Sequence, residues 1–322
     1  MIRCFRPGIT LLAVGAGAAC AGSEVTVPPT PVGEVRESIP LQYRPYGLAV
    51  AGSSAFVTQL DAATVTRVEL SEPASVRSPV TVGSIPTGVA VTRDGGQMLV
   101  ANQGDASVAL IDVATGSQTV FRTQGSPFRV IVSGDGRRGY ATTSVGEIVS
   151  IDLIAHRVLG TLSTGKPANG LALGPDGNRL YVSSTSGGIA VVDLASFTIA
   201  SELNVPGQLQ EVVVAPDGSE LYVADEGGRL VIVRLAGFGV TSVQMPGAFG
   251  MALSLDATQL WITQPYVGTI TMVDRVTHAV IKTITVGTGV GTVGFGVPRR
   301  IAFTSGGLAV VTDEGGKVHV IR

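Results

Sequence analysis

The stretch Pro86–Thr123, PTGVAVTRDGGQMLVANQGDASVALIDVATGSQTVFRT, decides the fold, because it recurs with variations along the chain. Turn-forming residues such as Asp94-Gly95-Gly96 interrupt it too often for a helix to intervene. Between the turns lie four short β-prone runs, which are Val89–Val91, Gln97–Asn102, Ser107–Val113 and Ser117–Thr123. The stretch therefore predicts one antiparallel sheet of four strands joined by tight turns.

Seven copies of this unit follow one another, and the spacing of their opening strands is regular. The separations between the first apolar residues are 41, 41, 41, 41, 39 and 50 residues. Those residues are Leu48, Val89, Val130, Leu171, Val212, Met251 and Ile301. Runs such as Val108–Ile111 are apolar on both faces, as expected for a sheet packed between two others. Repeats of about 40 residues with four strands each are typical of β-propellers. We therefore predict an all-β fold, a seven-bladed β-propeller of four-stranded antiparallel blades over residues 34–322.

The last unit is too short to form a whole blade by itself. From Ile301 to Arg322 there are residues for only three strands. The segment Glu34–Leu41, EVRESIPL, lies before the first complete unit and has the length of a strand. We predict that this N-terminal strand closes the last blade, because pairing the two chain ends removes two open sheet edges.

The beginning of the chain has the pattern of an export signal. Two arginines precede the apolar run Ile9–Ala19, which is too short to span a bilayer comfortably. Cys20 follows, at the position where bacterial lipoprotein signals have their lipidated cysteine. Gly17, three positions before it, replaces the larger residue that is usual in such signals. Cleavage after Ala21 by the ordinary signal peptidase is the alternative.

We therefore expect residues 1–20 to be an export signal of the lipoprotein type and residues 21–33, rich in Pro, Thr and Val, to be a tether. The expected location is the bacterial periplasm or cell envelope, with a lipid anchor on Cys20 as the contact with the membrane. The chain has two cysteines, so the mature protein has no cysteine pair and must fold without a disulfide.

The composition gives no electrostatic reason for a nucleic-acid partner. Charged residues make up 14% of the chain and the formal net charge is −2. We expect a monomer without nucleic-acid binding.

Several short motifs resemble the YVTN-type β-propeller repeat, as in YncE-like exported proteins. They are LYV at 180–182 and 221–223, VAN at 100–102, VALID at 108–112, AVVD at 190–193, PDG at 175–177 and 216–218, and KTITVG at 282–287. The resemblance covers roughly residues 34–322 and implies the propeller fold. The family resembled includes exported proteins of unknown role, surface-layer components and relatives of propeller enzymes, so the resemblance implies no single activity.

Candidate ligand-binding residues lie on the loops that precede the first strand of each blade and on those that join its second and third strands. In a meandering blade both loop sets lie on one face, where the mouth of the channel opens. The candidates are Arg44, Asn102, Asp105, Arg129, Lys166, Asn169, Gln210, Asp225, Glu226, Tyr266, Arg299, Arg300, Asp313 and Glu314. Cations around an axial opening would focus a positive potential on an anionic ligand. The alternative is that these are solvated loop charges without a common target.

For the other residues that could take part in chemistry, we predict structural roles. The aspartates that end third strands are expected to cap turns rather than form a carboxylate ring, and they are Asp112, Asp152, Asp193 and Asp274. The three histidines, His156, His278 and His319, fall in different blades and predict no metal centre. Trp261 is expected to be a packing residue. The insertion Gly287–Gly296 lacks the lysine of a phosphate loop and is expected to be a flexible loop over the channel mouth.

Two functional hypotheses remain at this point. The favoured one is a non-enzymatic binding or interaction scaffold that needs no cofactor and binds a protein, a glycan or a small anionic ligand at the channel mouth. The alternative is a hydrolase or lyase with a metal held by carboxylates in the central channel, as in relatives of streptogramin lyase or lactonases. The nearest candidate ligands for that metal are Asp225, Glu226, Asp313 and Glu314.

Overall fold

The computed structural model describes residues 30–287, 289 and 297–322. The expected export signal, Cys20, most of the tether and most of the Gly287–Gly296 insertion lie outside the described residues.

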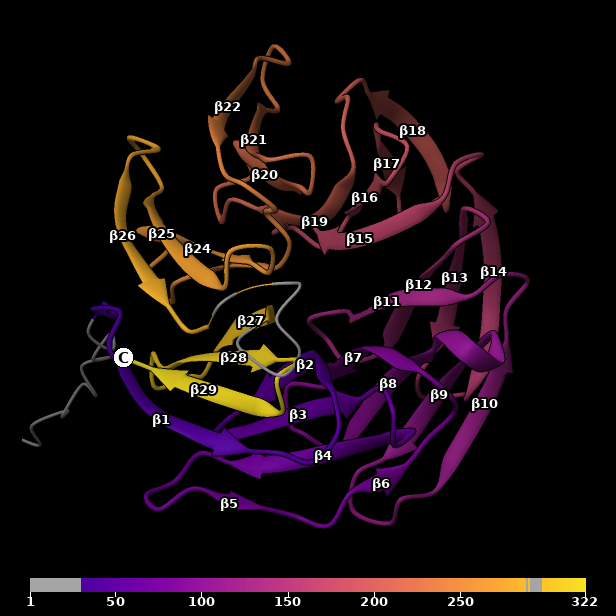
Figure 1. The fold of residues 1–322 in the computed structure, drawn as a ribbon. Coiled ribbons are helices and arrows are strands. Elements are labelled where there is room, and N and C mark those ends of the chain that lie inside the picture. Colours follow the sequence, from indigo (N-terminus) through magenta and orange to yellow (C-terminus); the bar gives the residue numbers. More distant parts are fainter. Residues whose placement is uncertain (1–29, 288, 290–296) are drawn as a thin grey trace, which may run out of the picture.

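The described chain forms seven sheets that stand around a common axis, as Figure 1 shows in a view down the ring. We number the blades from 1 to 7 in the order of their innermost strands. These innermost strands are β2 (Pro45–Ala51), β7 (Pro86–Val91), β11 (Pro127–Val132), β15 (Ala168–Leu173), β19 (Leu209–Val214), β23 (Met251–Leu253) and β27 (Pro298–Phe303). The second strands are β3 (Ser54–Gln59), β8 (Gln97–Asn102), β12 (Arg138–Thr143), β16 (Arg179–Ser184), β20 (Glu220–Asp225), β24 (Gln259–Gln264) and β28 (Ala309–Asp313).

The remaining strands lie farther from the axis. The third strands are β4 (Thr64–Glu69), β9 (Ser107–Asp112), β13 (Glu147–Asp152), β17 (Ile189–Asp193), β21 (Arg229–Arg234), β25 (Thr269–Asp274) and β29 (Lys317–Ile321). The outermost strands are β10 (Gln118–Arg122), β14 (Arg157–Ser163), β18 (Thr198–Leu203), β22 (Val240–Gln244), β26 (Val280–Thr285) and β1 (Val35–Pro40), while blade 1 has two short pieces, β5 (Ser75–Val76) and β6 (Val80–Thr81). A 3-10 turn, η1 (Gln103–Asp105), joins β8 to β9. Within the described part of the chain, no helix has the length and apolarity needed to cross a membrane.

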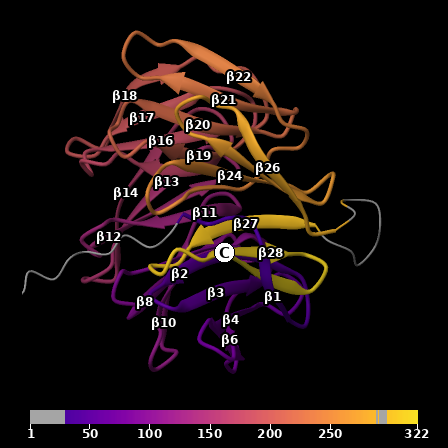
Figure 2. The ribbon, with the colours of Figure 1, turned by 90° about the vertical axis from the view of Figure 1, so that its left-hand side faces the viewer.

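The predicted unit is confirmed: strands β7 to β10 occupy the four predicted runs and pair in sequence order. The predicted closure of the ring is confirmed as well. Strand β1 pairs with β29, with Ile39 opposite Val318, and the blade is ordered β1-β29-β28-β27. The backbones of Glu34 and Arg322 exchange two hydrogen bonds of 3.0 Å. Figure 2, a side view, shows β1 close to the C-terminus.

The apolar core lies between neighbouring blades rather than within one. Between blades 2 and 3, for example, Leu99 and Leu110 pack against Val130 and Ile151, and all four are buried. Trp261 is 0% exposed between blades 6 and 7, where it meets the ring of Phe303 edge-on at 5.5 Å. It is therefore the packing residue that the sequence predicted. A single blade could not bury these faces, so the ring is the unit that folds.

The aspartates at the ends of third strands cap turns, as predicted. Asp112 accepts hydrogen bonds of 2.8 Å from both the backbone N–H and the hydroxyl of Thr115. The hydroxyl bond, followed by the backbone bond, holds the pKa of Asp112 below its ordinary value. Asp152, Asp193 and Asp274 each accept a hydrogen bond from the backbone N–H three residues further on. These carboxylates stabilise turns on the perimeter of the ring and do not form a site.

Candidate functional site

The innermost strands begin with an irregularity that determines what the channel contains. In six blades the register of the innermost strand shifts within its first three or four residues, as between Pro127 and Arg129. Such a bulge breaks the strict alternation of side chains, so that two consecutive side chains can both point toward the channel. These two consecutive positions directly precede the first apolar residue of each repeat. The first of them is occupied around the ring by Tyr46, Thr87, Phe128, Asn169, Gln210, Phe249 and Arg299. The second is occupied by Gly47, Gly88, Arg129, Gly170, Glu211, Gly250 and Arg300.

Glycine at the second position allows the next blade to approach closely. A Cβ atom on Gly88 would lie 2.7 Å from the carbonyl oxygen of Phe128, and one on Gly250 would lie 2.2 Å from that of Arg299. Three blades have a charged residue here instead, and they are blades 3, 5 and 7. The three charged side chains meet one another.

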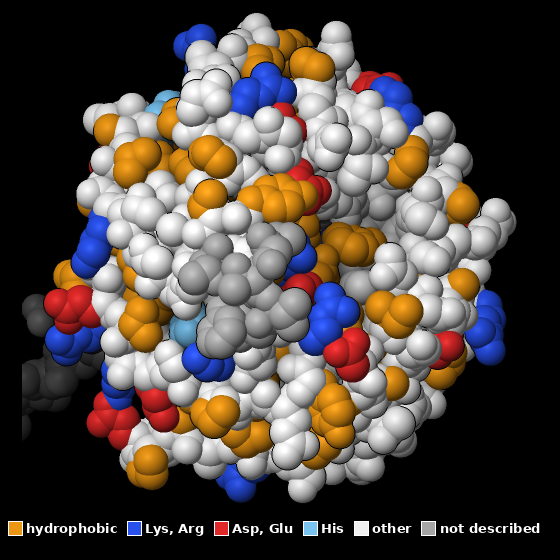
Figure 3. Space-filling view, in the orientation of Figure 1, with side chains coloured by type: hydrophobic (Ala, Val, Ile, Leu, Met, Phe, Trp, Pro, Cys, Tyr) orange, Lys and Arg blue, Asp and Glu red, His pale blue; other side chains and the backbone are white. Residues whose placement is uncertain are grey.

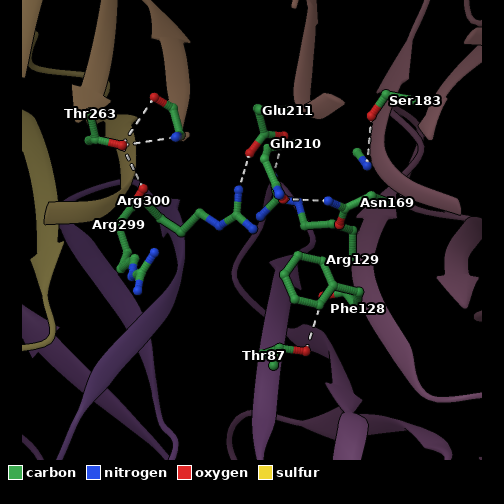
Figure 4. A network of polar contacts seen from close by, with 12 residues as sticks. Thr87, Phe128, Arg129, Asn169, Ser183, Gln210, Glu211, Thr263, Arg299 and Arg300 are labelled. Atoms are coloured by element: carbon green, nitrogen blue, oxygen red, sulfur yellow. Dashed lines mark hydrogen bonds and ion pairs between the residues drawn. The ribbon is translucent and has the colours of Figure 1, made fainter. Parts of the chain in front are cut away.

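Hydroxyl side chains of the second strands hold this inner rim together. Thr263 accepts a hydrogen bond of 2.8 Å from the N–H of Gly250 in its own blade and donates one of 2.8 Å to the carbonyl of Arg299 in the next (Figure 4). Thr312 does the same between the N–H of Arg300, at 3.0 Å, and the carbonyl of Tyr46, at 2.7 Å. These bonds fix the backbone from which the channel residues project.

The centre of the site is an ion cluster that spans the axis. Glu211 accepts one hydrogen bond from Arg129, with 2.7 Å between Nη2 and Oε1, and another from Arg300, with 2.6 Å between Nη1 and Oε2. Figure 4 shows the two guanidinium groups approaching from opposite sides toward the same carboxylate. The side chains of Arg300 and Glu211 are 3% and 5% exposed, and that of Arg129 is 17% exposed. The cluster thus has two positive charges and one negative charge in a buried environment.

Three aromatic rings surround the Arg300 guanidinium. Its Cζ atom lies 4.7 Å from the ring centroid of Phe249, 5.6 Å from that of Phe128 and 5.7 Å from that of Tyr46. Arg299 lies over two of the same rings, 4.9 Å from Phe249 and 5.7 Å from Tyr46. Ring faces attract cations but accept no strong hydrogen bond, so they stabilise the charge without satisfying its donors.

The charge cluster is therefore left with donors that lack acceptors. The buried Nε atom of Arg129 and the buried Nε and Nη2 atoms of Arg300 have no hydrogen-bond partner among the described residues. Burial, followed by repulsion from Arg129, lowers the pKa of Arg300 to about 10, while Glu211 and Tyr46 oppose the shift. Arg300 therefore stays charged at neutral pH.

A chain of hydrogen bonds extends the site toward the rim. Asn169 donates to Gln210 at 2.5 Å, Gln210 donates to Glu226, and the hydroxyl of Tyr266 donates to the same carboxylate. On the other side of the cluster, Glu314 accepts hydrogen bonds from Arg299 at 3.0 Å and from Arg44 at 3.3 Å. Arg44 also lies 3.6 Å from Asp61. Figure 3 shows the surface of this face, where positive and negative side chains adjoin near its middle.

The structure thus brings Arg129 and Arg300 to the same carboxylate, that of Glu211, and brings Arg299 and Arg44 to that of Glu314. It connects Asn169, Gln210, Glu226 and Tyr266 in one chain. It places the remaining predicted residues elsewhere. Asp225 is 1% exposed and accepts from the N–H groups of Gln208 and Gly227, which fixes two loops. Asp313, also 1% exposed, accepts from the N–H groups of Val297 and Gly315.

Three further candidates have local partners. Asn102 donates to Ser107 at 3.4 Å and is 1% exposed. The carboxylate of Asp105 accepts a hydrogen bond of 2.7 Å from the N–H of Ser84. Lys166 pairs with Glu202 of the outermost strand β18.

Four members of the cluster were missed by sequence reasoning: Glu211, Tyr46, Phe128 and Phe249. The signal was present in the opening runs YGLAV, TGVAV, FRVIV, NGLAL, QEVVV, FGMAL and RRIAF. Their second letters are G, G, R, G, E, G and R, so three charged residues interrupt a glycine column. Their first letters provide the three aromatic rings.

The described residues also border an open groove on the other end of the blades. It has a volume of about 810 Å³ and lies between the turns that follow β11 and β15. Its carboxylates Asp135 and Asp176 accept hydrogen bonds from their own turns, at 3.0 Å from Arg137 N–H and from Asn178 N–H. Because these acceptors have structural partners, whereas the channel arginines have free donors, we place the candidate site at the channel cluster.

The solved proteins that are similar in structure to this chain include the following two. Hydrazine synthase from Kuenenia stuttgartiensis matches with a TM-score of 0.78 and 19% sequence identity, covering 86% of this chain and 95% of that one. The β-propeller domain of Cps50 (Swd1) from Myceliophteria thermophila matches with a TM-score of 0.76 and 13% identity, covering 89% and 98%. No family model and no curated protein sequence matches the chain. At these identities the likeness shows the fold alone, and the molecule is a seven-bladed β-propeller with an ion cluster across its channel.

Proposed function

We propose that this protein is a binding module whose channel-mouth face binds a small anionic ligand. The observation that carries the proposal is the excess of arginine in the channel cluster. Arg129 and Arg300 share the single carboxylate of Glu211, and three of their buried nitrogen atoms have no acceptor among the described residues. An unsatisfied buried donor costs about 1–3 kcal/mol, and more when it is charged. An anion with several oxygen acceptors removes that cost, which is the physical basis for binding.

The excess of positive charge lies in the channel and not at the rim. Arg299 and Arg44 share Glu314, and Arg44 also lies 3.6 Å from Asp61, so the two positive charges at the rim are balanced. In the channel, Arg129 and Arg300 share one carboxylate, and this local excess favours an anionic ligand.

Anion binding is expected to raise the melting temperature of the purified protein. The probes are sodium sulfate, phosphate and acetate, each compared with sodium chloride at equal ionic strength. A ligand at about 100 times its Kd stabilises the folded state by about 2.7 kcal/mol. Arg129→Gln is expected to reduce this stabilisation several-fold, whereas the exposed turn residue Arg137, replaced in the same way, should leave it unchanged. Equal melting temperatures in all four salts, or equal responses of the two variants, would refute the proposal.

The metal-dependent hydrolase or lyase considered from the sequence has no supporting observation. Among residues 30–287, 289 and 297–322, no three His, Cys, Asp or Glu side chains gather in a way that could hold a metal ion. The four carboxylates considered as ligands have other partners: Asp225 binds Arg229, Glu226 binds Tyr266, Asp313 binds His319 and Glu314 binds Arg299.

We further propose that the protein is exported and anchored by lipid at Cys20, as the signal pattern and the resemblance of the repeats to YVTN-type exported propellers support. Cells grown with labelled palmitate are expected to yield labelled protein that partitions with membranes. Cys20→Ala is expected to abolish the label and to release the protein from the membrane fraction. If the wild-type protein carries no label, the anchor is wrong and cleavage by the ordinary signal peptidase takes its place.

A further inference from the structure

A serine, a histidine and an aspartate form a hydrogen-bonded chain in the closing blade, away from the channel cluster. Ser38 Oγ lies 2.8 Å from His319 Nδ1, and His319 Nε2 lies 3.0 Å from Asp313 Oδ2. The serine comes from β1 and the other two from β29 and β28, so the chain ends meet to build the group. None of the three residues contacts Arg129, Arg300 or Glu211 through a hydrogen bond.

The register of the sheet explains why the three side chains meet. Ser38 lies directly opposite His319, and His319 lies directly opposite Val311. Side chains at opposite positions project from the same face of a sheet. Asp313 is two residues beyond Val311 and therefore shares that face. Along the row, exposure rises outward: Val311 is 0% exposed, His319 is 4% exposed and Ser38 is exposed.

The hydrogen-bond partners determine where the protons lie. Asp313 is held by two backbone N–H groups on Oδ1, from Val297 at 2.7 Å and Gly315 at 2.8 Å. Burial alone would raise the pKa of Asp313, but the bonds from His319 and from these two N–H groups lower it. An ionised carboxylate only accepts, so His319 must carry a proton on Nε2. When His319 is neutral, its Nδ1 then presents a lone pair, and the hydroxyl of Ser38 donates to it.

This arrangement is that of an activated hydroxyl. In such a chain the serine hydroxyl can act as a nucleophile, the histidine as the base that takes its proton, and the buried aspartate as the group that orients the histidine. We propose that Ser38 is a nucleophile that becomes acylated by small activated carboxylic esters, with His319 as general base and Asp313 as a positioning residue.

The step can be written in full. Ser38 Oγ forms a bond to the ester carbonyl carbon as its proton passes to His319 Nδ1, and the carbonyl π electrons move to oxygen. The tetrahedral centre collapses, the bond to the leaving alcohol breaks, and that alcohol takes the proton from His319. Water then attacks the acyl group by the same route and regenerates the hydroxyl. Because β1 pairs on one side only among the described strands, N–H groups along its free edge remain to bind the developing oxyanion.

The test uses a fluorophosphonate probe on the folded protein, followed by mass spectrometry of the peptides. Attack by Ser38 forms an O–P bond, releases fluoride and passes the serine proton to His319, so the adduct marks the nucleophile. Two internal controls are Ser201 and Ser242, which are also exposed on outermost strands but lie opposite Val191 and Val231 instead of a histidine. The expected result is modification of Ser38 at least 100-fold faster than of either control, since general-base catalysis contributes about 10²–10⁴.

Further measurements separate catalysis from a structural role. Asp313→Asn is expected to slow labelling, since an amide no longer fixes the tautomer, and Ser38→Ala should remove the adduct while leaving the melting temperature nearly unchanged. If folded wild-type protein labels Ser38 no faster than Ser201, Ser242 or its own urea-denatured form, the proposal is overturned. Anion binding at the channel would be unaffected by that outcome.

Discussion

Replacing Glu211 by glutamine is expected to lower the free energy of unfolding by about 3–5 kcal/mol, because two buried arginines lose their shared counter-charge. The carboxylate accepts from Arg129 on one oxygen and from Arg300 on the other. Glutamine has one acceptor oxygen, and its amide N–H₂ would face a guanidinium donor. Urea denaturation followed by far-UV circular dichroism measures the change.

The matched control for this substitution is Glu202→Gln. Glu202 also pairs with a cation, Lys166, but the two side chains are 50% and 43% exposed. Exposed ion pairs contribute about 0–1 kcal/mol, so this variant should unfold almost like the wild type. Equal effects of the two substitutions would mean that the channel cluster is no more desolvated than a surface pair.

The same variant connects stability with the proposed function. Without Glu211 the channel cluster keeps the two positive charges of Arg129 and Arg300 and has no negative charge. An added anion then neutralises a larger net positive charge than in the wild type. Sulfate is therefore expected to recover more of the lost stability in the Glu211→Gln protein than it adds to the wild type.

Removing β1 is expected to produce the other large effect. A chain that begins at Gln42 lacks Ile39 and Leu41, which are 5% and 8% exposed in the cluster between blades 7 and 1. Full burial of two such side chains contributes about 3–6 kcal/mol, to which the ladder with β29 adds. The loss also leaves β29 as an open edge with Val318 and Val320, and such an edge pairs with other chains.

The measurement compares chains that begin at Thr30 and at Gln42. Size-exclusion chromatography with light scattering is expected to show a monomer for the first and oligomers for the second, and urea denaturation should show a lower midpoint for the second. A monomeric protein with an unchanged midpoint would show that blade 7 does not depend on its N-terminal strand.

The fold could be predicted from the sequence because the same pattern of strands and turns occurs in seven successive repeats. Each of the seven opening runs, turns and third strands is an independent observation of the same unit, and the three-strand remainder at Ile301–Arg322 identified the closing strand. Averaging over copies compensates for the weak signal of any one short strand.

The site was predicted only in part, since it consists of departures from the repeat. Arg129 and Arg300 were identified as loop cations, but Glu211 stands inside the apolar run QEVVV. The alternation of side chains in a regular strand does not predict that Glu211 contacts arginines from two other blades. The register shift between Leu209 and Glu211 explains this contact, and it is visible only in the structure. Asp225 and Asp313 have partners that no local sequence pattern indicates, because the fold places each carboxylate beside N–H groups of neighbouring loops.

Closure by the two chain ends also sets the order of assembly during translation. Residues 38 and 319 are 281 positions apart, yet their side chains share a hydrogen bond. Strand β1 therefore finds its partner β29 only after all the repeats between them have been made, and contacts between residues so far apart in the chain slow folding. The time before β1 can pair with β29 is therefore set by the synthesis of all seven repeats and not by the synthesis of one repeat.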